Sequence, residues 1–456
     1  MDRRRFLACI AAAATAPALG ASCAAARTQA SALQTDRRGL LDLPKGFSYR
    51  VVSRAGEPMA DGLLVPGAHD GMAVFAGSGD RVTLICNHEL TPDWSDLSGF
   101  ADRYNDLPEA TRRKLYDRGG DITPGLGGTT TTIFNTASGQ TERQFLSLAG
   151  TENNCAGGAT PWGSWLSCEE TFAAAGQASD GDTTIFREQQ HGYVFEVSAA
   201  ATGLNRAEPI KAMGRFEHEA AAVHAASGIV YMTEDRYFSL FYRYIPEVPG
   251  ELHKGGRLQA LAVTDAPSMA THNWGKEADV PLEKHLPVRW IDLDNVDSGN
   301  NTLRLRGTRA GAATFARGEG LCVAGDEFAF TCTEGGFAKL GQVFVYRPSP
   351  FEGTDREQSA PGTLRLIAEA QEDSILRNAD NLTMSPWGDL IVCEDTSGHC
   401  GLVGIRPDGS MYPLADNVHS DSELAGVCFS ADGRTLFVNI QYPGMTLAVT
   451  GPWPGS

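Results

Sequence analysis

The sequence is poor in positive charge. Its 456 residues contain 38 Lys and Arg against 56 Asp and Glu, which gives a formal net charge of −18. Such an excess of negative charge disfavours nucleic acid and anionic membrane surfaces as partners, and we expect no nucleic-acid partner. An anionic substrate would need bound cations to invert the local field.

Several familiar catalytic motifs are also missing. The chain has no G-x-S-x-G elbow and no P-loop. The glycines of GLGGTTTT lead into threonines rather than into a helix, which disfavours a dinucleotide site. His218-Glu219 is followed by alanines, so the second histidine of an HExxH zinc helix is absent.

The only strongly apolar run lies at the N-terminus and is too short to span a bilayer. A basic head that includes Arg3-Arg4-Arg5-Phe6-Leu7 precedes this Ala-rich run. The pattern predicts a twin-arginine signal peptide over residues 1–30, and therefore export by the twin-arginine machinery to the periplasm or the medium. Cys23 leaves lipoprotein anchoring open as an alternative, although Leu19 stands one place too far upstream for a lipoprotein box.

The ten cysteines show no CxxC spacing. Disulfides are possible in an oxidising compartment, but they do not organise this chain. Cys155, within NCAGGATPWGSWLSCEET, leaves three interpretations open: half of a disulfide, a buried small hydrophobe, or a thiolate ligand facing the acidic pair Glu169-Glu170.

The chain contains an internal repeat. Short alternating apolar runs with Gly, Pro, Asn and Asp turns dominate, and helical patterns are scarce. Each repeated segment has a polar or acidic residue, an apolar stretch, a turn, a second apolar stretch and a polar or acidic end. Six segments follow this plan: 70–89, 154–170, 217–235, 317–334, 380–395 and 423–439. Two of them even share a near-identical turn, Thr160-Pro161-Trp162-Gly163 and Ser385-Pro386-Trp387-Gly388.

Repeated strand hairpins predict an all-β fold, a six-bladed β-propeller with large loop insertions, as a single domain over residues 40–456. A β-sandwich is the alternative, but it does not explain acidic residues at equivalent places in every segment. In a propeller these residues converge at one mouth of the central channel. They are Glu89, Cys155, Glu169 or Glu170, Glu219, Glu234, Asp235, Glu319, Asp380, Asn381, Glu394 and Asp395.

So many carboxylates cannot remain ionised together without cations. Hard oxygen ligands suit Ca²⁺ or Mg²⁺, and several carboxylates with one thiolate suit iron. A solvated loop acid is the alternative for any single member of the set.

The motifs NCAGGATPWGSWLSCEET, RFEHEAAAV, YMTEDR, RGEG, DNLTMSPWGDLIVCED and LFVNIQYPG together resemble the PhoX-type alkaline phosphatases over roughly residues 40–450. The resemblance implies a six-bladed propeller, twin-arginine export, and hydrolysis of phosphate monoesters. It also implies a cofactor of two Fe³⁺ and three Ca²⁺ with a bridging oxo group. A small phosphorylated substrate and a monomeric protein are the corresponding expectations.

The resemblance also implies roles for individual residues. Cys155 is similar to the family's thiolate iron ligand, and Glu219 and Glu319 to the catalytic carboxylates that bridge the irons. Arg317 is similar to the arginine that grips the phosphate, with a surface salt bridge as the alternative, and Asn154 is expected to join it in binding substrate. The other expected metal ligands are Glu89, Glu169, Glu170, Glu234, Asp235, Asp380 and Glu394.

One motif departs from the family, because Gln441-Tyr442-Pro443 stands where the family usually has Gln-His-Pro. Two other functions also remain open. One is a calcium-dependent lactonase or esterase propeller, and the other is a non-catalytic binding propeller stabilised by calcium.

Overall fold

The fold is built almost entirely from β-strands. The computed structural model describes residues 32–101, 103–180 and 183–455, so the predicted signal peptide and Cys23 lie outside the described residues. Within these ranges the α-helices are two short ones, α3 (Glu109–Arg112) and α4 (Leu303–Arg309). In the same part of the chain, no helix has both the length and the apolar character that a membrane crossing needs.

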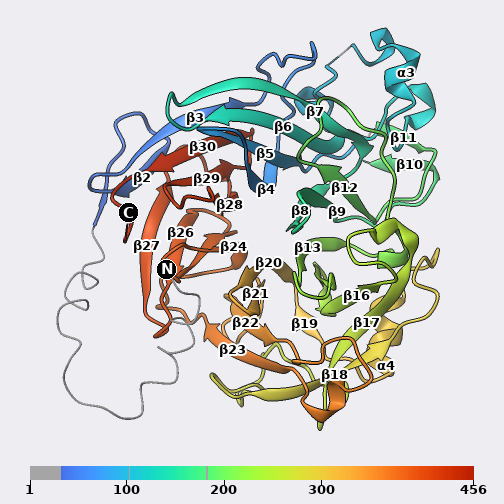
Figure 1. Ribbon diagram of the computed structural model, residues 1–456, viewed down its shortest axis with the longest axis vertical. Helices are drawn as coiled ribbons and strands as arrows, with labels where there is room; N and C mark the ends of the chain where they lie inside the picture. Colours follow the sequence, from blue (N-terminus) through green and yellow to red (C-terminus); the bar gives the residue numbers. More distant parts are fainter. Residues whose placement is uncertain (1–31, 102, 181–182, 456) are drawn as a thin grey trace.

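The larger sheets stand around a common centre (Figure 1). The first has the order β4 (His69–Ala76), β5 (Arg81–His88), β6 (Gly127–Asn135), β7 (Gln140–Thr151), and the second has β8 (Asn154–Ala159), β9 (Ser164–Glu169), β12 (Val194–Ser198). A nine-stranded sheet follows, in the order β13 (His218–Val223), β14 (Val230–Glu234), β16 (Tyr242–Pro246), β17 (Gly256–Val263), β18 (Leu286–Asp292), β23 (Thr363–Glu369), β22 (Gln342–Arg347), β21 (Glu327–Cys332), β20 (Gly318–Ala324).

Two further sheets complete the circle and contain strands from both ends of the chain. One has the order β24 (Ala379–Met384), β25 (Leu390–Glu394), β26 (Gly401–Ile405), β27 (Met411–Asn417), β2 (Leu41–Pro44), β1 (Leu33–Gln34). The other has β28 (Leu424–Phe429), β29 (Thr435–Ile440), β30 (Met445–Thr450), β3 (Ser48–Arg54). The antiparallel pairing of β3 with β30 joins the N-terminal region to the C-terminal region.

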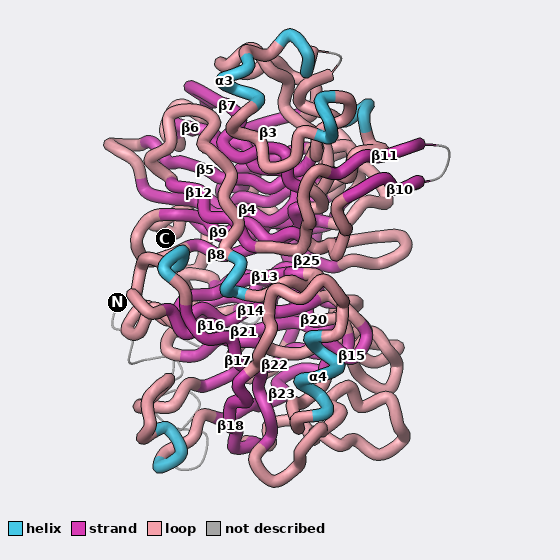
Figure 2. The backbone as a smooth tube through the Cα atoms, turned by 90° about the vertical axis from the view of Figure 1, so that its right-hand side faces the viewer, coloured by secondary structure: helices cyan, strands magenta, loops and turns pink. Residues whose placement is uncertain are grey.

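The innermost strands form a closed ring. Each contacts the next in the order β4, β8, β13, β20, β24 and β28, and β28 contacts β4 again. A nearly all-β, propeller-like arrangement was predicted from the repeated segments, and at that level the prediction is confirmed. Seen from the side, the two-stranded hairpin of β10 (Gly176–Asp180) and β11 (Thr183–Arg187) projects beyond the main sheets (Figure 2).

Small residues line the places where inner strands approach one another. A Cβ added at Gly158 of β8 would lie 1.9 Å from the carbonyl oxygen of Ala221 in β13. A Cβ added at Gly71 of β4 would lie 2.5 Å from the Cα of Ala156. The small residues of NCAGGA and HEAAAV therefore reflect the crowding of strands at the centre of the ring.

The two similar turns lie where the repeat predicted them, between the inner and second strands of their hairpins. Gly163 and Gly388 end these turns with φ of 84° and 95°, a conformation that glycine adopts without strain. The tryptophan of each turn donates its indole N–H to an acid, Glu196 at 2.6 Å for Trp162 and Asp389 at 2.8 Å for Trp387.

Candidate metal centre

Every inner hairpin carries the same β-bulge near the mouth of the ring. In each hairpin two residues of the first strand face one residue of the second. The shift follows the first residue pair in five hairpins and the second pair in the hairpin of β28 and β29. A bulge bends the strand and re-aims a side chain. The first bulged residues are Asp70, Cys155, Glu219, Glu319, Asp380 and Gly426. Five of these six positions thus carry an acid or a thiol.

One backbone hydrogen bond closes each hairpin at the mouth. The residue after the second strand donates its N–H to the carbonyl of the residue before the first strand, for example Glu170 to Asn153 at 2.9 Å and Asp395 to Asn378 at 3.0 Å. Asn153, Arg317 and Asn378 precede their strands with φ of 50°, 55° and 46°. These left-handed residues turn the chain into the inner strand and hold the mouth side chains in place.

Ligand atoms converge in three overlapping groups whose members lie within 4.8 Å of one another. The groups are Cys155, Glu170 and Glu219; Glu219, Glu319 and Asp380; and Asp380, Asp395 and Glu423. Because Glu219 and Asp380 are each shared by two groups, the three form one continuous cluster. The structure therefore brings together Cys155, Glu170, Glu219, Glu319, Asp380 and Asp395 from the predicted set.

The cluster is electrostatically unfavourable as a set of bare anions. Burial, then the charges of Asp380 and Asp70, raise the pKa of Glu219 well above its usual range. Burial also raises the pKa of Asp380 to about 6 and, with Glu219 and Glu170, raises that of the Cys155 thiol. Bound cations remove this repulsion and favour the deprotonated thiol and carboxylates. The donor set therefore fits multivalent cations. At one end of the cluster a thiolate and carboxylates are available together.

The two acids of each predicted pair have different surroundings. The carboxylate of Glu169 accepts hydrogen bonds from the backbone N–H groups of Glu152, Gly192 and Tyr193 and bonds His191 Nδ1 at 2.6 Å. Glu170, the next residue, is the one that joins Cys155 and Glu219.

Glu394 and Glu234 resemble Glu169 in being held by their own hairpin regions. Glu394 accepts from the N–H groups of Arg377 and Gly401, at 2.8 and 3.1 Å. Glu234 accepts from the Tyr242 hydroxyl at 2.8 Å. The structure does not place Glu169, Glu234 or Glu394 in the three groups, and Asp395 rather than Glu394 joins Asp380.

Glu89 lies beside the cluster without belonging to the three groups. Its carboxylate accepts from Asn153 Nδ2 at 3.1 Å and from Gln441 Nε2 at 2.7 Å. Burial and the charge of Asp380 raise the pKa of Glu89 to about 7. The neighbouring Tyr442, at the departure from the family motif, is 51% exposed and meets Trp94 edge to face.

The structure places Asn153, rather than the expected Asn154, beside the acids of the mouth. Asn154 is fully buried, where its amide accepts from Thr151 at 2.6 Å and donates to Ser167 at 2.9 Å. Asn153 instead donates to the carboxylates of Glu89 and Glu170, at 3.1 and 3.2 Å. The amide that faces the mouth is therefore that of Asn153.

Arg317 lies inside the acidic mouth. Its guanidinium donates to both oxygens of Asp235, at 2.7 to 3.2 Å, and to Glu319 at 3.0 Å. Burial alone would lower the pKa of Arg317, but the hydrogen bond with Asp235 and the charge of Glu319 raise it overall. Its side chain is 27% exposed, so it is a fixed cation that ligands can reach. Asp235 is thus held by Arg317, outside the three groups.

Sequence reasoning missed three side chains of the mouth: Asp70, Asn153 and Glu423. Asp70 and Glu423 begin the first and last repeated segments, so the equivalence of the segments was a signal that pointed to both. Asp70 stands at the bulge position, and burial with the charges of Glu89 and Asp380 raises its pKa. Nothing in the sequence pointed to Asn153 except its position directly before a predicted strand.

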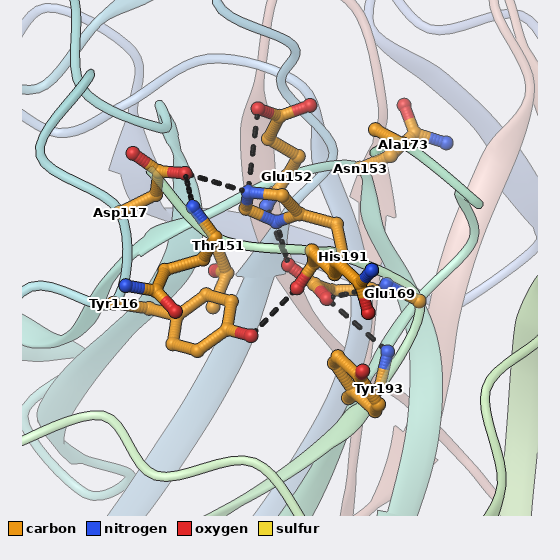
Figure 3. Close-up of polar contacts among 12 residues, drawn as sticks. Tyr116, Asp117, Thr151, Glu152, Asn153, Glu169, Ala173, His191 and Tyr193 are labelled. Atoms are coloured by element: carbon orange, nitrogen blue, oxygen red, sulfur yellow. Dashed lines mark hydrogen bonds and ion pairs between the residues drawn. The ribbon is translucent and has the colours of Figure 1, made fainter. Parts of the chain in front are cut away.

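A second buried network lies behind Glu169 (Figure 3). His191 contacts Glu169 through Nδ1 and Asp117 through Nε2, at 2.6 and 3.3 Å, while Arg187 pairs with Glu152 at 2.7 Å. Burial by itself would lower the pKa of His191, but Glu169 and Asp117 raise it to about 10. The imidazolium therefore fixes Glu169 on the side away from the cluster.

Disulfides play no part in the described region. The eight cysteines that the structure describes, Cys155 among them, are all free. Of the three interpretations of Cys155, the disulfide is therefore excluded among these residues.

These features define a propeller-like protein with a buried, anionic, thiol-containing centre suited to several cations. The chain belongs to the PhoX alkaline phosphatase family, because the family model described as "Alkaline phosphatase PhoX" matches residues 28–444. Membership in this metal-dependent family implies phosphatase activity. The resemblance seen in the sequence motifs is thereby confirmed.

Among solved structures, the chain is similar to Pseudomonas fluorescens PhoX in complex with vanadate, a transition state analogue. The TM-score is 0.64 at 18% identity, over 92% of this chain and 97% of that chain, which is a similarity of fold. A Xanthomonas campestris gluconolactonase reaches a TM-score of 0.32 at 13% identity, over 88% and 99% of the two chains. A streptogramin B lyase reaches 0.39 at 8% identity, over 89% and 98%. The comparison with curated proteins gives no match.

Proposed function

We propose that this protein is an exported phosphatase that hydrolyses phosphate monoesters at the mouth of its ring of inner strands. The observation that carries the proposal is the position of Arg317, a partly exposed guanidinium held between Asp235 and Glu319 at the edge of the cluster. Guanidinium N–H groups are strong donors to phosphoryl oxygens, and those of Nη1 are not used by Asp235 or Glu319. Family membership supports the reaction class.

We further propose a single domain over residues 40–456 with six blades. The closed contact ring of β4, β8, β13, β20, β24 and β28 supports this number, since each strand opens one hairpin with the same bulge. Twin-arginine export, a periplasmic or secreted location and a monomeric state complete the proposal.

Iron and calcium fit the residues of the cluster. Cys155, with Glu170 and Glu219, supplies the thiolate end suited to iron, and Asp380, Asp395 and Glu423 supply an all-oxygen end suited to calcium. Glu219, Glu319 and Asp380 connect the two ends. When bound, such cations neutralise the anionic centre, attract the phosphate and polarise its oxygens.

The chain's own side chains would bind and orient the ester. Arg317 would donate to the phosphoryl group through Nη1, the nitrogen that Asp235 and Glu319 leave unused, and would balance negative charge in the transition state, while Asp235 keeps its guanidinium in a fixed plane. Asn153 offers an amide N–H at the same mouth and orients Glu89 and Glu170. Glu219 and Glu319 lie at the bulges that bring their carboxylates together.

Metal analysis combined with an assay tests this proposal. Purified protein should contain iron and calcium and should hydrolyse p-nitrophenyl phosphate, and a chelator should abolish the activity. Cys155→Ser should lose iron and activity by orders of magnitude, because a hydroxyl is a poor replacement for a thiolate ligand.

Cys168→Ser is the matched control, since Cys168 is also buried but belongs to none of the three groups. This variant should keep its iron. Full phosphatase activity in Cys155→Ser would contradict the assignment. Calcium without iron would favour a lactonase or a non-catalytic binding protein.

A further inference from the structure

An aromatic cluster stands beside Arg317 at the rim of the candidate centre. We call it the aromatic rim, and it consists of Tyr237, Phe238, His272 and Trp274. The Trp274 ring stacks on His272 with centroids 4.0 Å apart and meets Phe238 and Tyr237 edge to face at 5.5 and 6.2 Å. Tyr237 and Phe238 are 51% and 49% exposed, so their rings remain open to a ligand.

Backbone pairing fixes the aromatic rim relative to Arg317. Strand β15 (Tyr237–Ser239) pairs with β19 (Phe315–Ala316), and Tyr237 lies opposite Ala316, the residue before Arg317. The N–H of Arg317 also donates to the carbonyl of Arg236 at 3.1 Å.

Glu334 joins the aromatic rim to the candidate phosphate site. Its carboxylate accepts from the Tyr237 hydroxyl at 2.8 and 2.9 Å and lies 3.8 Å from the Arg317 guanidinium. Its carbonyl accepts the indole N–H of Trp274 at 2.7 Å. The Glu334 side chain therefore links the rings to Arg317, the cation proposed to bind phosphate.

Packing does not account for this arrangement. Phe238 has φ of 59°, a left-handed conformation that is costly for a bulky residue, and half of its side chain faces solvent. The four rings belong to none of the buried apolar clusters among the described residues. Lys339 Nζ lies over the Trp274 ring, 4.9 Å from its centroid, which adds a cation to the rim.

We propose that the aromatic rim binds a planar aromatic ring carried by the alcohol part of the phosphate ester. The intervening Glu334 favours a ring that is separated from the ester oxygen by a short spacer, as a sugar separates a nucleobase from its phosphate. This inference rests on the proposed phosphatase function and names the substrate class that the same site prefers.

Stacking on the rings strengthens binding of the remote part of the substrate, and this free energy can be used in the transition state. Stacking of one base on an aromatic side chain increases the binding affinity roughly tenfold or more. The gain applies only to substrates that carry a ring at the right distance.

A matched pair of substrates tests the inference on the full, metal-loaded protein. A nucleoside 5′-monophosphate and ribose 5-phosphate present the same phosphate ester with and without a planar base. The ratio of their kcat/KM values should be about ten or more in the unmodified protein. Phe238→Ala and Trp274→Ala should each lower this ratio several-fold. Phenyl phosphate, whose ring is attached directly to the ester oxygen, should show a smaller preference.

Phe186→Ala is the control, because Phe186 is 45% exposed and lies on β11, away from the aromatic rim in the sheet arrangement. It should leave the ratio unchanged. A ratio near one in the unmodified protein, or an equal loss for both substrates in the rim variants, would overturn the inference while leaving the phosphatase function intact.

Absence of hydrolysis for every ester would instead refute the proposed function. In that case, the affinity for the same nucleoside 5′-monophosphate, measured by calorimetry, tests the aromatic rim independently of hydrolysis. Weaker binding in Phe238→Ala than in Phe186→Ala would support the aromatic rim, and equal binding would overturn it.

Discussion

At the scale of single residues, hydrogen bonds decide which member of an acidic pair reaches the centre. Three backbone N–H groups and His191 surround the carboxylate of Glu169. Glu170 follows directly, and its side chain therefore points to the opposite side, toward Cys155. A strand alternates its side chains between two faces, so only one acid of each pair can join the cluster.

His191 predicts a loss of stability at high pH. Because its folded pKa, about 10, lies above the ordinary 6.5, its ion pairs contribute fully below about pH 6.5 and are lost as the pH rises through about 10. His191→Gln should lower the free energy of unfolding by about 3–5 kcal/mol near neutral pH, since it leaves buried carboxylates without their cation.

Chemical denaturation between pH 7 and 10.5 measures this effect. The difference between the unmodified protein and His191→Gln should shrink as the pH rises. His253→Gln is the control, because His253 is exposed on the short turn Leu252–Lys254, and it should have little effect. A difference that stays constant with pH would contradict a charged His191.

At the scale of elements, the repeated hairpin explains how distant parts of the chain build one site. The bulge re-aims one side chain per inner strand, and a backbone hydrogen bond closes the open end of the hairpin. The inner strands must approach closely for these side chains to meet. Small residues such as Gly158 permit that approach.

Gly158→Ala should therefore disturb both packing and the centre. The added methyl would collide with the carbonyl of Ala221 in the neighbouring strand, where the backbone cannot yield freely. We expect the free energy of unfolding to fall by about 1–3 kcal/mol or more, and metal content to fall with it. Denaturation and elemental analysis measure the two effects.

Gly203→Ala is the matched control, because a Cβ at Gly203 has no neighbour within 4 Å and its φ is not left-handed. The free energy of unfolding and the metal content of that variant should be close to those of the unmodified protein. Equal stability of Gly158→Ala and Gly203→Ala would show that the inner strands can separate without cost.

At the scale of the whole molecule, the ring concentrates anions in a chain whose net charge is already −18. Acids from several sheets meet in one buried cluster, and burial raises the pKa of Glu219, Glu319 and Asp380. Without cations this repulsion opposes folding, so the metals are expected to stabilise the closed ring as well as to bind substrate.

Chelation should therefore lower the midpoint of thermal unfolding by several degrees, and added iron and calcium should restore it. The midpoint of Glu219→Gln should rise less when metals are added, because Glu219 belongs to two of the three groups. Its metal-free form should be more stable than that of the unmodified protein, since one buried charge is gone. Scanning calorimetry of the unmodified protein and of Glu219→Gln, each with and without chelator, measures these midpoints. An unmodified protein that is insensitive to chelation would contradict this role.

The sequence predicted much of this architecture because the repeat is local. Each hairpin is a contiguous segment with its own turn, and the near-identical turns ending in Gly163 and Gly388 recur in the structure. Cys155, Glu219, Glu319 and Asp380 were predicted because each stands at the polar start of an inner strand. A local pattern of this kind is set by strand period and turn chemistry.

Only the tertiary structure decided how the side chains meet. Residue spacing could not distinguish Glu170 from Glu169 or Asn153 from Asn154. Glu169 is held by His191, and Asn153 bonds Glu89 of another hairpin. The aromatic rim likewise joins residues that are far apart in the chain, such as Phe238 and Trp274. The sequence alone determined the hairpins, the acidic positions and the family, because these are local patterns. The closed ring decided which of those groups face one another.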